Sequence, residues 1–162
     1  MSDTLACQTL INGSCLCGAV KYTIAGGYAL TVLCHCNSCR KFTGSSFGAN
    51  SLVDRAADLT GLVVNQNLTV HDLESKISVY TASTAESGTS LARSFCSACG
   101  SSLFVANNAL PNQVAVTSGS MDNVQGGHDA DNDKMWKPKL EFFCKRKATW
   151  LATEGTVQRD SM

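Results

Sequence analysis

Short runs of β-branched and aromatic residues, bounded by Gly, Asn and Ser, recur along most of the chain. Residues of these types suit the pleated, half-buried surface of a sheet, so each run predicts a short strand. The predicted strands cover Ala19–Ile24, Leu30–Leu33, Ile77–Thr81, Leu91–Phe95, Leu103–Val105, Val114–Thr117 and Leu140–Cys144. The pattern therefore predicts a mainly β fold in which helix is confined to brief turns.

Between the predicted strands, glycine and polar residues mark turns and longer connections. The pair Gly26-Gly27 separates the first two strands, and such a pair suits either a hairpin turn or a looser loop. Residues 54–72 show only weak periodicity, and residues 121–137 are polar and contain glycine. We expect both stretches to be surface insertions.

Length and composition predict a single domain over residues 1–162. A chain of 162 residues that is 44% hydrophobic can bury one core and is too short to expect two. The longest apolar runs are a few residues, such as Leu62-Val63-Val64, so no membrane segment is expected.

Charge and the first residues narrow the expected partners and compartment. Thirteen basic residues balance thirteen acidic ones, which disfavours nucleic acid and anionic membrane surfaces as partners. The opening Met1-Ser2-Asp3-Thr4 lacks the basic region and apolar run of a secretory signal. We therefore expect a cytoplasmic protein.

Seven of the nine cysteines fall into three tight clusters, with the spacings C-x-C, C-x-C-x-x-C and C-x-x-C. These spacings bring thiolates onto one metal ion, and zinc is the metal that such sets typically bind. A disulfide framework is the alternative. The odd cysteine total, the missing signal and the awkward pairing of cysteines one residue apart count against it.

Seven ligands divide naturally into four and three. The first and third clusters both end in Cys-Gly, and glycine tolerates the positive φ that a zinc-binding turn often needs. We expect these two clusters to form one closed structural zinc site, with the ligands Cys15, Cys17, Cys96 and Cys99. Because its two halves lie far apart in the sequence, loss of this metal should cost the fold.

The middle cluster, Cys34, Cys36 and Cys39, would hold a second zinc with one position left for water, substrate or a cofactor thiol. Arg40 and Lys41 follow it directly. They would balance the net charge of the three-thiolate site or hold an anionic substrate, unless they are merely solvated residues of a short turn. Alternatively, a carboxylate or histidine from elsewhere fills the fourth position and closes the site.

His35 lies between two of these predicted ligands. In an extended segment its side chain points away from those of its neighbours, so it is a poor fourth ligand. It would then contact the ligands from behind, contact the substrate, or simply pack. The remaining histidines and cysteines show no partner pattern, and we expect the former on the surface and the latter to act as small hydrophobes: His71, His128, Cys7 and Cys144.

Three segments together resemble the glutathione-dependent formaldehyde-activating enzyme family, which also includes centromere protein V. They are GSCLCGAV at 13–20, CHCNSCRKFTG at 34–44 and RSFCSACGS at 93–101, and the similarity extends to 118–122 and 138–150. The resemblance implies a β-tent fold of packed antiparallel sheets. It also implies a structural zinc on the four-cysteine set and a labile catalytic zinc on the three-cysteine set. The chain departs from the family in two places: Glu141 stands where the family's tail usually carries histidine, and residues 54–72 do not follow the family's pattern.

The resemblance further implies a carbon-sulfur lyase that interconverts formaldehyde plus glutathione with S-hydroxymethylglutathione. The expected partner is a small-molecule thiol adduct or another small electrophile, in general or specialised metabolism, with His35, Arg40 and Lys41 as candidate catalytic residues. The alternative is a noncatalytic zinc module that binds a protein or nucleic acid. Retention of all three cysteines in the middle cluster favours an enzyme, because a scaffold needs only the closed site.

Overall fold

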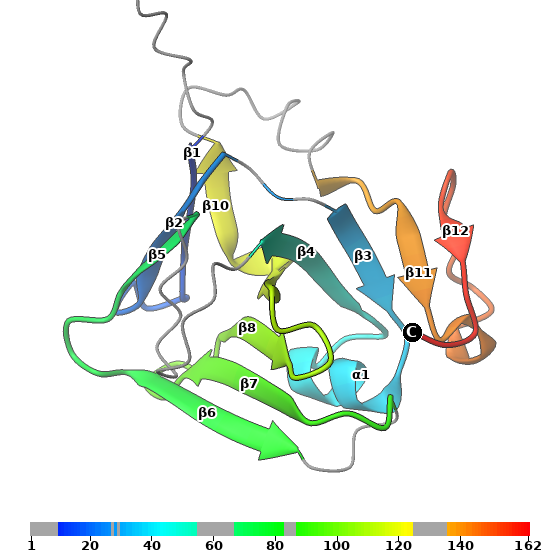
Figure 1. The fold of residues 1–162 in the computed structure, drawn as a ribbon, viewed down its shortest axis with the longest axis horizontal. Coiled ribbons are helices and arrows are strands. Elements are labelled where there is room, and N and C mark those ends of the chain that lie inside the picture. The colour runs from blue at the N-terminus through cyan, green and yellow to red at the C-terminus, as the bar shows by residue number, and fades with distance from the viewer. Residues whose placement is uncertain (1–9, 27, 29, 55–66, 83–86, 125–135) are drawn as a thin grey trace, which may run out of the picture.

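The computed structural model describes residues 10–26, 28, 30–54, 67–82, 87–124 and 136–162, which form two β-sheets (Figure 1). The four-stranded sheet has the order β10-β1-β2-β5. Its strands are β1 (Leu10–Ser14), β2 (Lys21–Ala25), β5 (Leu68–His71) and β10 (Met121–Val124).

The eight-stranded sheet has the order β12-β11-β3-β4-β9-β8-β7-β6. Its strands are β3 (Leu30–Cys34), β4 (Gly48–Asp54), β6 (Ile77–Ala82), β7 (Leu91–Cys96), β8 (Ser102–Asn107), β9 (Gln113–Thr117), β11 (Leu140–Phe142) and β12 (Val157–Gln158). Among the described residues, helix is limited to α1 (Asn37–Thr43) and the 3-10 turns η1 (Ser118–Ser120) and η2 (Cys144–Arg146). The mainly β fold with brief helices is thus confirmed.

All seven predicted strands are present. Of the two alternatives left open at Gly26-Gly27, the hairpin is excluded, because β2 pairs with β1 and β5 whereas β3 pairs with β4 and β11. The eight-stranded sheet is also mixed, since β11 runs parallel to both β3 and β12. Parallel neighbours need a long connection, and the chain between the end of β3 at Cys34 and the start of β11 at Leu140 provides one.

The two predicted insertions are shorter than expected. Leu68–His71 forms β5, which pairs with β2, and Leu68 is fully buried in the core. Met121–Val124 forms β10, which pairs with β1. The interiors of both stretches, 55–66 and 125–135, lie outside the described residues, as do Cys7 and His128. Their character as insertions therefore stays a prediction.

The main core lies between the two sheets, where each contributes alternate residues of its strands. Tyr22 of β2 packs edge-on against Phe104 of β8, with ring centroids 5.2 Å apart, and its hydroxyl bonds Ser120 at 2.7 Å. This ring needs Gly13 on the neighbouring strand, because a Cβ there would lie 2.1 Å from the ring carbon Cζ of Tyr22. The close packing fixes how the sheets face each other.

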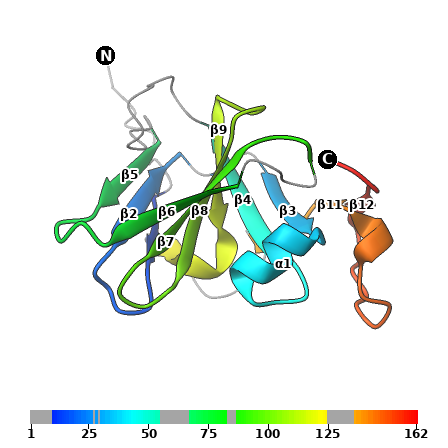
Figure 2. The same cartoon turned by 90° about the horizontal axis from the view of Figure 1, so that it is seen from below.

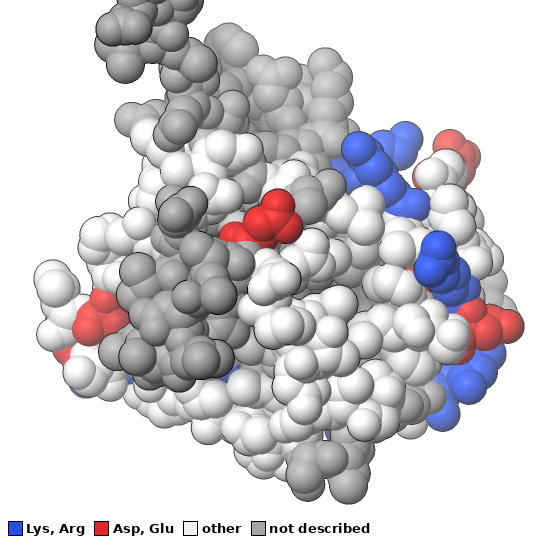
Figure 3. All heavy atoms as spheres, viewed as in Figure 1, with Lys and Arg blue, Asp and Glu red and all other residues white. Residues whose placement is uncertain are grey.

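The helix α1 follows β3 directly and lies beside β3 and β4 (Figure 2). Cys36 is its N-cap, and Gly44 ends it in the left-handed conformation with φ +63°. Among the described residues, no helix is long and apolar enough to cross a membrane. In the view of Figure 3, Lys and Arg gather over the β11 and β12 edge, and much of the remaining described surface is uncharged.

Candidate metal centres and the adjoining cavity

The first and third cysteine clusters meet in space, as predicted. Cys15 and Cys17 follow β1, Cys96 is the last residue of β7, and Cys99 lies in the turn that follows it. Their four sulfur atoms lie within 4.8 Å of one another, with Cys17 Sγ 3.5 Å from Cys15 Sγ and 3.8 Å from Cys96 Sγ. A tetrahedron with Zn–S bonds of 2.3 Å has edges of about 3.8 Å. The four-cysteine cluster therefore fits one zinc ion.

The two turns of this cluster are built alike. Gly18 and Gly100 have φ of +76° and +75°, and their N–H groups donate to the carbonyls of Cys15 and Cys96 at 2.9 and 2.8 Å. Such turns aim backbone N–H groups at the sulfurs. Hydrogen bonding from Ser101 lowers the pKa of Cys99 to about 5, so this thiol is readily held as the thiolate that zinc binds.

The four-cysteine cluster also links the two sheets. One pair of ligands comes from the β1–β2 turn of the small sheet, and the other from the β7–β8 turn of the large sheet. The Leu16 N–H donates to Ser101 Oγ at 2.9 Å across the same gap. A metal held here would fasten the sheets together at one end.

The middle cluster, Cys34, Cys36 and Cys39, forms where β3 passes into α1, and its sulfurs also lie within 4.8 Å of one another. The Cys39 N–H donates to Cys36 Sγ at 3.3 Å, as an N-cap requires. Hydrogen bonds from Cys34 and Cys39 lower the pKa of Cys36 to about 2, whereas Cys36 and Cys39 raise the pKa of Cys34. Three thiolates this close repel one another, and a divalent cation removes that repulsion. The three-cysteine cluster therefore also fits a metal ion.

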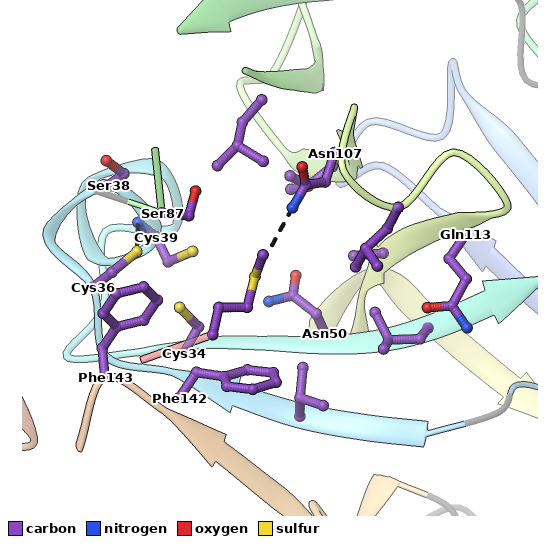
Figure 4. A pocket seen from close by; sticks show the side chains of 17 residues that line it. Cys34, Cys36, Ser38, Cys39, Asn50, Ser87, Asn107, Gln113, Phe142 and Phe143 are labelled. Carbon is purple, nitrogen blue, oxygen red and sulfur yellow. Dashed lines mark hydrogen bonds between the residues drawn. The ribbon is translucent and has the colours of Figure 1, made fainter. Parts of the chain in front are cut away.

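A cavity of about 130 Å³ with a largely apolar lining opens on all three sulfur-bearing residues of the three-cysteine cluster, whereas a separate polar hollow reaches Cys15 of the four-cysteine cluster. Cys34, Cys36 and Cys39 lie at one end of the cavity (Figure 4). The cavity runs across one face of the large sheet, over β11, β3, β4, β9, β8 and β7, and the apolar residues of its lining include Val32, Leu52, Val105, Leu110, Ala115 and Phe142. Its polar side chains are Ser38, Asn50, Ser87, Asn107 and Gln113.

His35 faces away from this cavity and is completely buried. Its Nε2 lies 2.8 Å from Glu141 Oε2, and its ring meets that of Phe47 edge-on. The alternation expected from an extended segment is present, since Cys34 and Cys36 line the cavity and His35 does not. His35 therefore contacts the cysteine segment from behind and is no fourth ligand in this geometry.

Glu141 is the centre of a buried polar network. It lies on β11, is fully buried, and is bound by Lys147 Nζ and by the hydroxyls of Thr153 and Thr156 as well as by His35. Burial raises the pKa of this carboxyl, but the hydrogen bonds from Thr153, Thr156, His35 and Lys147 together lower it to about 2. Glu141 is thus a carboxylate at neutral pH.

Cys144, which we expected to stand alone, lies close to this network. Its sulfur, a nitrogen of His35 and a carboxylate oxygen of Glu141 fall within 4.8 Å of one another. The Lys147 ammonium, 3.0 Å from Glu141 Oε2, already supplies a cation there. We therefore assign no metal to this group.

Arg40 and Lys41 lie in the last turn of α1 with exposed side chains, and neither lines the cavity of the three-cysteine cluster. Cations in the last turn stabilise a helix through its dipole, which accounts for them without a substrate. Lys41 instead borders the polar hollow beside Cys15 and Ser101. His71 is exposed at the end of β5, as expected.

Sequence reasoning missed Arg93. It is 3% exposed, its guanidinium lies 5.9 Å from the Phe42 ring centroid, and its Nε and Nη2 have no hydrogen-bond partner among the described residues. The pKa of Cys39 responds to this charge. A hydrogen bond from Cys34 and the positive charge of Arg93 both lower it, but Cys36 and burial outweigh them and raise it to about 11. The signal was present in the sequence, since an arginine stands in the apolar alternation of Leu91, Arg93 and Phe95.

Comparisons with known proteins agree with this geometry. A sequence model of the family described as glutathione-dependent formaldehyde-activating enzyme matches residues 10–146. A protein of Halomonas elongata, named for the same family, is 30% identical over 151 residues, which are 92% of this chain and 84% of the relative. The crystal structure of a Rhodobacter sphaeroides protein matches with a TM-score of 0.50 and 21% identity, over 74% of this chain and 93% of that one. This last likeness supports the fold alone.

Proposed function

The chain belongs to the glutathione-dependent formaldehyde-activating enzyme family, and from this premise we propose that it is a zinc-dependent carbon-sulfur lyase acting on a thiol-carbonyl adduct. The observation that carries the proposal is the contrast between the two cysteine clusters. Four sulfurs complete a coordination sphere, whereas three sulfurs at the end of a cavity leave a position that a small molecule can reach.

In this proposal Cys15, Cys17, Cys96 and Cys99 hold a structural zinc, and Cys34, Cys36 and Cys39 hold a catalytic one. When bound, zinc supplies a Lewis acid that polarises a carbonyl or hydroxyl oxygen and favours the thiolate of a thiol. The overall reaction conserves all atoms. A carbon–sulfur bond forms between the thiol sulfur and the carbonyl carbon as the thiol proton passes to the carbonyl oxygen, and the reverse reaction breaks that bond.

The residues of the chain have separate parts in this reaction. The apolar lining of the cavity excludes water from the adduct, and the amides of Asn50 and Asn107 can orient its polar atoms. His35, fixed by Glu141, is a positioning residue that holds the backbone between Cys34 and Cys36. Glu141 thereby has a role although the family's tail usually carries histidine at its position.

Arg40 and Lys41 have no part in the proposed reaction, because neither lines the cavity. Both cysteine clusters must remain reduced to bind metal, so the proposed activity requires a reducing compartment such as the cytoplasm. The alternative of a noncatalytic zinc module remains an outcome of the test.

The test measures how fast the purified, zinc-loaded protein interconverts free ¹³C-formaldehyde and its thiol adduct. Exchange NMR detects this rate. Glutathione and benzyl mercaptan serve as thiols. We expect acceleration that is lost in Cys36→Ser and retained in Cys144→Ser, a cysteine outside both clusters. Absence of acceleration with either thiol would refute the lyase and favour a noncatalytic module.

A further inference from the structure

Apart from the three cysteines themselves, the lining of the cavity beside the three-cysteine cluster carries no charged side chain among the described residues. Among the described residues that line it, none is Lys, Arg, His, Asp or Glu, and most are apolar. A pocket that binds a charged ligand supplies opposite charges or dense hydrogen bonding, because burying an uncompensated charge is costly. The lining therefore selects against charged groups.

The apolar floor follows from the register of the large sheet. Leu52 on β4 is opposite Ala115 on β9, and Ala115 is opposite Val105 on β8. Residues that face each other across paired strands lie on the same side of a sheet, so these three form one continuous row. Their neighbours along the strands, such as Val53 and Val114, point into the core on the other side. The row is thus part of the sheet itself.

The polar groups of the cavity are neutral. Asn50, Asn107 and Gln113 offer amides, which donate and accept hydrogen bonds without charge. Asn107 Nδ2 lies 3.9 Å from the thioether sulfur of Met162, as the dashed line in Figure 4 marks. The half-exposed Met162 thus places an uncharged S-alkyl chain along the same lining.

None of the nearby described cations lines the cavity. The Arg93 guanidinium lies over the Phe42 ring, and Lys147 pairs with Glu141 behind the cysteine segment. Arg40 and Lys41 of α1 are exposed. Glutathione carries two carboxylates and an ammonium at neutral pH, and the described lining offers no partner for them.

We infer that the organic group bound beside the three-cysteine cluster is uncharged and mainly apolar, such as an aromatic or aliphatic thiol or aldehyde component of the adduct. This rests on the proposed function for the reaction at the cluster. The amides select for a neutral polar atom on that group, and glutathione is a poor occupant of the cavity.

The test uses two thiols of nearly equal size, benzyl mercaptan and 4-(mercaptomethyl)benzoate, which differ by one carboxylate. Calorimetric titration of the zinc-loaded protein should show benzyl mercaptan binding at least about tenfold more tightly, because the carboxylate must be desolvated without a partner. Ala115→Lys should reverse this preference. Val79→Lys adds the same charge at an exposed position of β6 and should leave the preference unchanged.

Leu110→Lys, at a 40% exposed position of the lining, replaces Ala115→Lys if that variant fails to fold. Equal affinities for the two thiols, tighter binding of the benzoate, or no binding of either would overturn the inference. The formaldehyde exchange assay reports separately. Preferential binding of benzyl mercaptan without turnover of any adduct would leave the cavity assignment intact and refute the lyase. Turnover with glutathione alone would do the reverse.

Discussion

Glu141 provides the sharpest test of how the candidate site is held together. Replacing it with Gln keeps its shape but removes the charge that binds Lys147 and orients His35. Because Glu141 is completely buried, the variant leaves Lys147 without its counter-charge. It also replaces one acceptor oxygen with an amide NH2 group, which cannot accept the hydrogen bonds that the carboxylate accepts. We expect Glu141→Gln to lower the free energy of unfolding at pH 7 by about 3 kcal/mol.

The magnitude follows from the ionisation of the carboxyl group. Its pKa falls from the usual 4.5 to about 2 in the folded protein, even though burial alone would raise it. At about 1.4 kcal/mol per pKa unit, this difference corresponds to about 3 kcal/mol. The sign is that of a depressed carboxyl pKa. The stabilisation is complete above pH 4.5 and is lost as the pH falls from 4.5 towards 2.

Urea unfolding monitored by circular dichroism, at fixed zinc concentration and from pH 7 to pH 3, measures this effect. Metal loss through cysteine protonation affects wild type and variant alike, so the difference between their unfolding free energies isolates Glu141. Glu154→Gln, at an exposed position, is the matched control and should change the unfolding free energy by less than about 0.5 kcal/mol. A Glu141→Gln effect no larger than the control, or one that is constant down to pH 3, would refute the reasoning.

Three further predictions concern the metal centres. Elemental analysis should find about two zinc ions per chain, one removed by mild chelation and one resistant, and a single fully resistant ion would contradict the open three-cysteine site. Cys99→Ser should be insoluble or unfolded by circular dichroism, since structural zinc contributes roughly 10–16 kcal/mol to folding. Cys36→Ser should instead fold and lose only the labile zinc. Equal loss of thermal stability in both variants would disprove this division. Arg93→Met should weaken labile zinc binding about tenfold in competition with a chromophoric chelator, with Arg93→Lys intermediate, and unchanged affinity in both would exclude charge compensation.

Several strands could not be read from hydrophobic pattern. Leu10–Ser14 and Gly48–Asp54 contain Asn, Gly and Ser, which favour turns, yet both are strands because they pair on both edges with neighbours in their sheets. Pairing partners also stayed hidden, since a strand's own residues do not encode which distant edge it joins. This is why β11 lies parallel to β3 against expectation.

The sequence alone determined the three cysteine segments, because the ligands within each segment are separated by one or two residues and short spacings fix local geometry. The shared Cys-Gly ending predicted that the first and third segments meet, although Cys17 and Cys96 are 79 residues apart. It also determined the mainly β fold, because period-two alternation is a local property. Only the tertiary structure decided the rest. The hydrogen bond between His35 and Glu141 spans 106 residues, Arg93 reaches the cysteine cluster from another strand, and six strands together form the cavity. Such contacts depend on the register and packing of whole sheets, which no local stretch of residues specifies.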